Sequence, residues 1–153
     1  MANKAYRAED IAKWFLSRNR ETNVLEGGDE NISNLKLQKL LYYAQGTHYA
    51  LTEKKLFNED IMAWTHGPVV ESIYHRYKEN GSDGIKFEEE YDINYIDKDT
   101  KQILEEVYDC FGQYSAWKLR NMTHEEEPWK NTKPNEVIDL EIIKNYFMRE
   151  IIE

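Results

Sequence analysis

The stretch that decides the fold runs from Ser33 to His48 and reads SNLKLQKLLYYAQGTH. Ser33 can accept a hydrogen bond from a free amide of the following turn, as the residue before a helix commonly does. One helical face then carries Leu37, Leu40, Leu41, Ala44 and His48. Tyr42 and Tyr43 widen this face. The pattern predicts a helix at the centre of the protein.

Working outward, shorter helical patterns flank this stretch on both sides. A helix is expected from about Ala8 to Arg18, followed by a solvated loop over Glu21–Asn31. Pro68 is suited to the first turn of a helix, because its missing N–H has no partner there in any case. Further helices are expected up to Asn80, from Asp99 to Gly112 with Asp99 and Gln102 as a capping box, in a short stretch after Ser115, and from Asp139 onward. Their apolar faces predict that Trp14, Trp117 and Cys110 pack in the core.

Two segments do not follow a helical pattern. Apolar and polar residues alternate weakly over Phe57–Trp64, which predicts at most one short strand. Lys78–Asp99 contains eight acids and three lysines, so it is expected to be an acidic loop, with a frayed edge strand as the alternative. The predicted fold is therefore mainly α: a single compact helical domain over residues 1–153, with five or six helices and at most a short β-strand pair.

Composition excludes several classes of protein. The 20 basic and 29 acidic side chains give a net charge of −9, so a nucleic-acid partner is disfavoured. No apolar run is long enough to span a membrane, and residues 1–10 do not resemble a signal peptide. Cys110 is the only cysteine, which excludes an intramolecular disulfide and fits a reducing, cytoplasmic location.

The sequence also lacks the enzyme motifs that have a known physical mechanism, such as a phosphate-binding glycine loop or a zinc-binding HExxH. His124 is followed by three glutamates, and imidazole with carboxylate is a possible metal-ligand set. A small metal-dependent hydrolase built on His124, His66 and nearby glutamates is therefore the alternative function. Adjacent residues rarely converge on one ion, so a solvated acidic loop is the preferred interpretation, and no metal or cofactor is expected.

Three segments, taken together and in order, resemble the Panacea domain family, also described as SocA-like or GepA-like and phage-associated. They are NLKLQKLLYYAQ at 34–45, AWTHGPV at 63–69 and THEEEPW at 123–129, with the closing IKNYF helix after them. The resemblance covers nearly the whole chain. It implies a mostly helical antitoxin of a bacterial or prophage toxin–antitoxin pair, which neutralises a co-encoded toxin by direct contact and is not an enzyme.

The resemblance also implies partners and site residues. Some SocA-like members hand the toxin to a Clp-type protease, so such a protease is a second expected partner. The charge of −9 favours a basic toxin, because opposite charges steer association. An acidic decoy that mimics nucleic acid is a third possibility. The residues expected to bind the toxin or to form the motifs are Lys39, Tyr42, Tyr43, Trp64, His66, Gly67, Pro68, Val69, His124, Glu125, Pro128 and Trp129.

Two of these segments combine proline with aromatic residues, and such elements need an apolar surface to rest on. We therefore expect the loop that holds His124, Glu125, Pro128 and Trp129 to pack near the corner formed by Trp64–Pro68.

Overall fold

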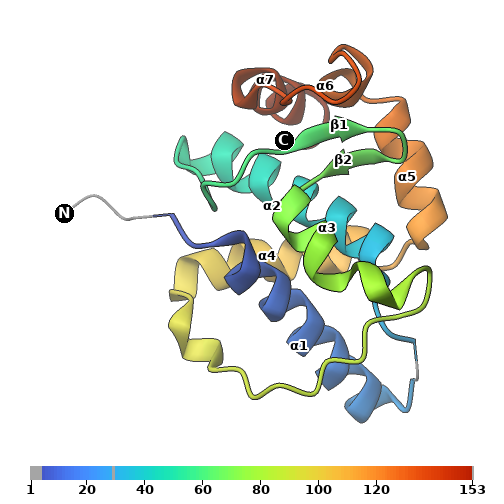
Figure 1. The fold of residues 1–153 in the computed structure, drawn as a ribbon. Coiled ribbons are helices and arrows are strands. Elements are labelled where there is room, and N and C mark those ends of the chain that lie inside the picture. Colours follow the sequence, from blue (N-terminus) through green and yellow to red (C-terminus); the bar gives the residue numbers. More distant parts are fainter. Residues whose placement is uncertain (1–4, 29, 153) are drawn as a thin grey trace.

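Helix α2 (Asn34–Thr52) passes through the middle of the molecule, and the other helices surround it (Figure 1). The structure is a computed structural model that describes residues 5–28 and 30–152. The remaining elements, in chain order, are α1 (Ala8–Glu26), β1 (Met62–Trp64), β2 (Gly67–Val69), α3 (Glu71–Tyr77), α4 (Lys98–Phe111), α5 (Ala116–His124), α6 (Glu127–Lys130) and α7 (Leu140–Glu150), with 3-10 turns at Lys78–Asn80 and Ile93–Tyr95. The mainly α fold class is confirmed. The described residues form seven α-helices rather than five or six, because the sequence pattern does not reveal the single turn α6.

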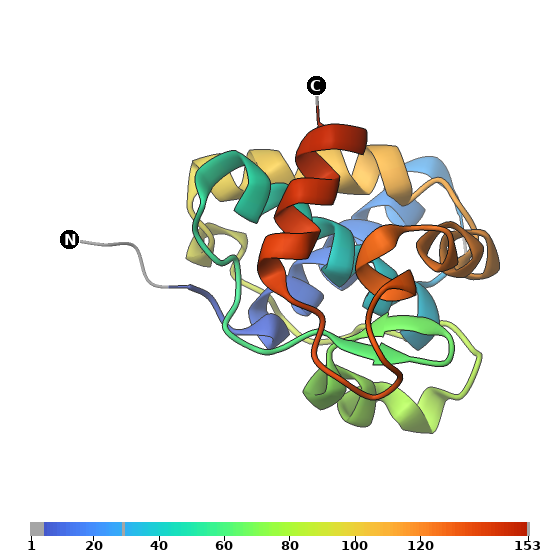
Figure 2. The ribbon, with the colours of Figure 1, turned by 90° about the horizontal axis from the view of Figure 1, so that it is seen from above.

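The central position of α2 is confirmed by its burial. Ser33 caps the helix, since its hydroxyl accepts a hydrogen bond from the Lys36 amide at 3.2 Å. Every residue from Leu37 to Thr47 is buried, so the helix is covered on all sides. Gly46 allows α7 to approach closely, because a Cβ at this position would lie 2.4 Å from the ring of Phe147. Figure 2 shows α7 in dark red crossing the molecule above α2.

Helix α1 is longer than predicted, so the expected loop over Glu21–Asn31 is wrong in its first half. The helix continues to Glu26 and ends at Gly27, whose φ of +71° suits glycine. The additional turns carry polar residues that contact distant parts of the chain: Arg20 donates to the Phe87 carbonyl at 3.1 Å, and Thr22 accepts from the Tyr108 hydroxyl of α4 at 3.1 Å. Periodicity of apolar residues cannot detect a helix that is held in this way.

The predicted strand within Phe57–Trp64 is confirmed only for its last three residues, and the expected role of Pro68 is wrong. Strands β1 and β2 form an antiparallel hairpin in which Trp64 pairs with Gly67 and Ala63 with Pro68. Pro68 therefore lies in a strand, and helix α3 begins only at Glu71. The hairpin tolerates this proline because β2 pairs only with β1, whereas β1 also bonds on its other edge, where the Ala63 amide donates to the Glu136 carbonyl at 2.9 Å.

The acidic segment between α3 and α4 is largely irregular, as predicted. It is anchored by apolar side chains that fold inward: Ile85 and Phe87 are buried, and the Ile85 amide donates to the Ile32 carbonyl at 2.7 Å. The predicted start of the next helix is wrong by two residues. Asp97, rather than Asp99, caps α4 and accepts a hydrogen bond from the Thr100 amide at 2.9 Å.

Two predicted core residues lie at the surface instead. Trp14 is buried as expected, but Trp117 on α5 is 56% exposed and Cys110 on α4 is exposed. The inward faces of these helices are occupied by Leu119 on α5 and by Leu104 and Val107 on α4. No helix in the described part of the chain is long and apolar enough to cross a membrane.

Candidate functional site

The β1–β2 hairpin is the place where the three motif segments meet. Lys39 of α2 donates from Nζ to the Pro68 carbonyl at 3.0 Å. From the third segment, Trp129 donates from Nε1 to the Trp64 carbonyl at 2.7 Å, and His124 Nε2 lies 2.8 Å from the Thr65 carbonyl oxygen. The predicted proximity of this segment to the Trp64–Pro68 corner is therefore confirmed. Hydrogen bonds to backbone carbonyls, rather than a shared apolar surface alone, make the contact.

Lys39 is fully buried under the turn of the hairpin. Burial, and secondarily the charge of Arg120, lowers the pKa of its amine to about 7. Gly67 lies directly against it with a φ of +108°, and a Cβ on Gly67 would lie 2.8 Å from both Lys39 Cε and Thr123 Oγ1. The residue after His66 therefore has to be glycine for two reasons, its backbone conformation and the lack of space for a side chain.

Polar residues at the start of α2 hold the other end of the hairpin. Gln38 is buried, and its side-chain oxygen accepts from the Val70 amide at 2.8 Å. Its amide donates to Asn34 at 2.9 Å, and Asn34 in turn donates to the Tyr74 carbonyl at 3.0 Å. The motif residues of α2 thus supply the hydrogen bonds that the ends of β2 and α3 need. Sequence reasoning did not assign a role to Gln38 or Asn34.

Glu126 is a further residue that sequence reasoning missed. It was expected in a solvated acidic loop, but it is buried and accepts hydrogen bonds from Tyr42 at 2.9 Å and from Tyr43 at 2.7 Å. Burial raises the pKa of this carboxyl to about 7, against the opposing effect of the two tyrosine hydroxyls. The sequence did contain an indication of this buried carboxylate: Tyr42 and Tyr43 lie on an apolar helix, and buried hydroxyls need a polar hydrogen-bond partner.

The predicted site residues therefore differ in how deeply they are buried. Lys39, Tyr42, Tyr43, Gly67, Pro68, Val69 and Pro128 are buried; Trp64, His124 and Trp129 are half-buried; His66 and Glu125 are exposed. The buried residues can position the hairpin, but they cannot touch a partner in this structure.

On the outside, the hairpin borders an open pocket of about 520 Å³ between α3 and α5. Its aromatic lining includes Trp64, Tyr74 and Trp117, and His66 projects from the hairpin turn beside them. The rings of Trp64 and Tyr74 meet edge to face at 5.1 Å. Trp117 is 56% exposed and Tyr74 is 37% exposed, so this pocket presents aromatic side chains to solvent.

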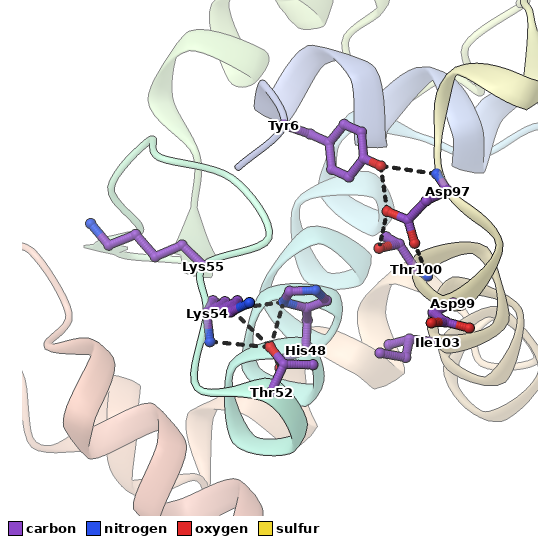
Figure 3. Close-up of a pocket in the computed structure, with 9 residues that line it drawn as sticks. All are labelled: Tyr6, His48, Thr52, Lys54, Lys55, Asp97, Asp99, Thr100 and Ile103. Atoms are coloured by element: carbon purple, nitrogen blue, oxygen red, sulfur yellow. Dashed lines mark hydrogen bonds between the residues drawn. The ribbon is translucent and has the colours of Figure 1, made fainter. Parts of the chain in front are cut away.

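A second pocket, of about 420 Å³, lies between the end of α2 and the start of α4 (Figure 3). Its polar groups bond mainly to one another: Tyr6 donates to the Asp97 carboxylate at 2.6 Å, and His48 Nδ1 lies 2.7 Å from the Lys54 carbonyl oxygen. Burial lowers the pKa of His48. Figure 3 shows these groups paired at the two helix ends, while Lys55 points away from them. We therefore interpret the polar groups of this pocket as caps of the two helix ends rather than as a binding site.

The residues of the alternative metal site do not assemble. Both ring nitrogens of His124 face carbonyl oxygens, those of Arg120 at 2.7 Å and Thr65 at 2.8 Å. His66 Nδ1 accepts a hydrogen bond from Arg120, and Glu126 points to the tyrosines. Within residues 5–28 and 30–152, no group of three or more His, Cys, Asp or Glu is placed to hold a metal ion. The metal-dependent hydrolase is therefore not favoured.

Comparison with known proteins points in one direction. The profile of the family described as "Antitoxin SocA-like, Panacea domain" matches residues 37–130, a range that runs from α2 to α6 and includes the hairpin. The protein "Antitoxin SocA" from Caulobacter vibrioides (strain NA1000 / CB15N) is 33% identical over 112 residues, which are 66% of this chain and 60% of that protein. The chain thus spans well under the full length of this curated relative. No solved structure matches the chain.

Proposed function

Because residues 37–130 match the family profile, the chain belongs to the SocA-like Panacea domain family of antitoxins, and we propose that it neutralises a co-encoded protein toxin by binding it directly. We further propose that the toxin contacts the pocket between the hairpin, α3 and α5. The protein then acts by occupying the toxin and performs no chemical step of its own.

The observation that carries this proposal is the exposure of aromatic side chains at the motif hairpin. Trp117 is 56% exposed, whereas the other predicted core tryptophan, Trp14, is only 4% exposed. Exposed tryptophan and tyrosine in a pocket are typical anchors of protein interfaces, because each buries a large area at little entropic cost. Trp117, Tyr74 and His66 therefore belong to the proposed contact surface, the pocket of about 520 Å³ described above, which we call the hairpin pocket.

The buried motif residues support this surface from below. Lys39 bonds to the carbonyl of Pro68, and Gln38 bonds to the amide that follows β2. Trp129 bonds to the carbonyl of Trp64 from the other side. In this proposal the buried motif residues hold the hairpin in one position, and the toxin binds the aromatic surface next to it.

Net charge contributes to the rate of encounter. A protein of charge −9 attracts a basic toxin over long range, and such steering changes association rates more than dissociation rates. A Clp-type protease as a second partner is a separate part of the proposal. It predicts that the half-life of the toxin in cells falls when the antitoxin is present and depends on that protease.

Co-expression with the adjacent gene tests the proposal. We expect the neighbour to be toxic alone and harmless with the wild-type protein. Trp117→Ala should lose protection at an unchanged melting temperature, since the ring is exposed. Tyr95→Ala is the matched control, because Tyr95 is 58% exposed and lies outside the pocket. A harmless neighbouring gene product, or toxicity that persists beside abundant folded antitoxin, would contradict the antitoxin function. Equal protection by both variants would contradict the proposed contact surface.

A further inference from the structure

The hairpin pocket differs in charge from the rest of this acidic protein. The chain has 29 acidic and 20 basic side chains, yet the residues that line the pocket include Lys78 and His66 and no aspartate or glutamate among those the structure describes. The acidic residues of the segment before α4 do not contribute to its lining. The proposed contact surface is therefore neutral to basic, whereas the molecule as a whole is acidic.

Arg120 does not line this pocket itself but contacts two residues that do, Trp117 and His66. Its guanidinium stacks over the Trp117 ring at 4.4 Å, and it donates to His66 Nδ1 at 3.2 Å and to Asn121 at 3.0 Å. Four of the five other arginines pair with carboxylates, Arg7 with Asp10, Arg18 with Glu105, Arg76 with Glu9 and Arg149 with Glu127, and the fifth, Arg20, donates to the carbonyls of Phe87 and Glu89. Within residues 5–28 and 30–152, Arg120 has no carboxylate partner, and its Nη2 group makes no hydrogen bond.

The hydrogen bond between Arg120 and His66 also determines which ring nitrogen of His66 can donate to a partner. Because Nδ1 accepts the hydrogen bond, the neutral ring carries its proton on Nε2 and presents a donor there. His66 and the Lys78 ammonium in the pocket lining, with Arg120 beside them, thus place several hydrogen-bond donors next to the aromatic side chains of the pocket. Carboxylates pair with such donors, and guanidinium in particular binds carboxylate with short, charge-assisted hydrogen bonds.

We infer that the hairpin pocket takes a short segment of the toxin in which an apolar side chain is flanked by aspartate or glutamate. The apolar side chain contacts Trp117 and Tyr74, and the carboxylates bind Arg120 and Lys78. This inference rests on the proposed function and specifies the chemistry of its partner. Two electrostatic effects then act at different stages of binding. The acidic exterior of the protein speeds the approach of a basic toxin, and the hydrogen-bond donors at the pocket select one acidic–apolar segment of that toxin.

A charge-reversal experiment on the purified pair tests this inference. Binding to the product of the adjacent gene would be measured by calorimetry for the wild type, Arg120→Glu, Lys78→Glu and the control Lys98→Glu, which reverses an exposed lysine outside the pocket. We expect Arg120→Glu and Lys78→Glu each to weaken binding by about tenfold or more, because like charges then face each other, and Lys98→Glu to have a small effect. Unchanged melting temperatures would show that both variants fold.

The segment itself can be identified by a photo-crosslinking amino acid at position 117 of the full-length antitoxin in complex with the toxin. We expect the crosslinked toxin peptide to contain Asp or Glu next to an apolar residue, and conversion of those acids to Lys to restore binding to Arg120→Glu. A crosslinked peptide that is basic, tighter binding by the charge-reversed variants, or a crosslink to a second copy of this chain would overturn the inference while leaving the antitoxin function intact. If the wild type does not bind the toxin at all, the proposed function itself fails.

Discussion

Glu126 provides the sharpest test of the buried polar interior. The ordinary pKa of a glutamate is 4.5, and burial raises that of Glu126 to about 7 in the folded protein. Between these values the folded state holds the proton more tightly than the unfolded state does. The free energy of unfolding therefore falls as the pH rises: the contribution is full below pH 4.5 and lost above pH 7. With about 1.4 kcal/mol for each tenfold change in proton affinity, the loss amounts to about 3 kcal/mol.

Glu126→Gln removes this titration with little change in shape. An amide can still accept from one tyrosine and donate to the other, so the contacts with Tyr42 and Tyr43 persist. Urea unfolding across the interval from pH 4.5 to 7 should show a free energy that falls by about 3 kcal/mol more in the wild type than in the variant. Glu125→Gln, at the exposed neighbouring position, is the control and should follow the wild type. If Glu126→Gln and the wild type give parallel curves, the carboxyl is not buried in the way we describe.

Other predictions address the fold and the encounter with the toxin. In the wild type the free energy of unfolding should increase as the pH rises from about 7 toward 10.5, because over this interval the Lys39 amine is neutral in the folded protein but still protonated in the unfolded one. Lys39→Met should abolish this increase, which urea unfolding at a series of pH values would measure. Leu41→Ala should cost about 2 to 5 kcal/mol through the cavity it leaves, and a change below about 1 kcal/mol in the same assay would contradict its burial. Gly67→Ala should destabilise by about 1 to 3 kcal/mol, because its φ is +108° and the new Cβ would meet Thr123; an unchanged melting temperature would count against this geometry. Reversing Glu88–Glu90 to lysine should slow association with the toxin and weaken its salt dependence, with little effect on dissociation, as stopped-flow kinetics would show.

Much of the helical framework was predictable because it depends on local patterns. Ser33 and Ser115 were expected to cap helices, and each accepts a hydrogen bond from the third residue that follows it. The failures have a common cause. The second half of α1 and the start of α4 are fixed by polar hydrogen bonds, as when Arg20 donates to the Phe87 carbonyl and Asp97 accepts from the Thr100 amide, and apolar periodicity contains no information on such contacts.

The candidate site was predictable in part. The motif segments could be expected to meet, and they do so at the hairpin, where Trp129 bonds to the Trp64 carbonyl. Their division into buried and exposed residues could not be predicted. Trp117 was expected in the core together with Leu119, but residues two apart in a helix point to nearly opposite sides. Leu119 is buried, so Trp117 faces outward.

The sequence by itself determined that this protein is mainly helical, that α2 is its centre, and to which family it is related. These properties follow from residue spacing and from motif order, which the chain carries without reference to its fold. Only the tertiary structure decided that Glu126 and Lys39 are buried, that Pro68 lies in a strand, and that Trp117, His66 and Arg120 share one surface. Burial and charge environment depend on segments far apart in the chain that pack together, so no local pattern of residues specifies them.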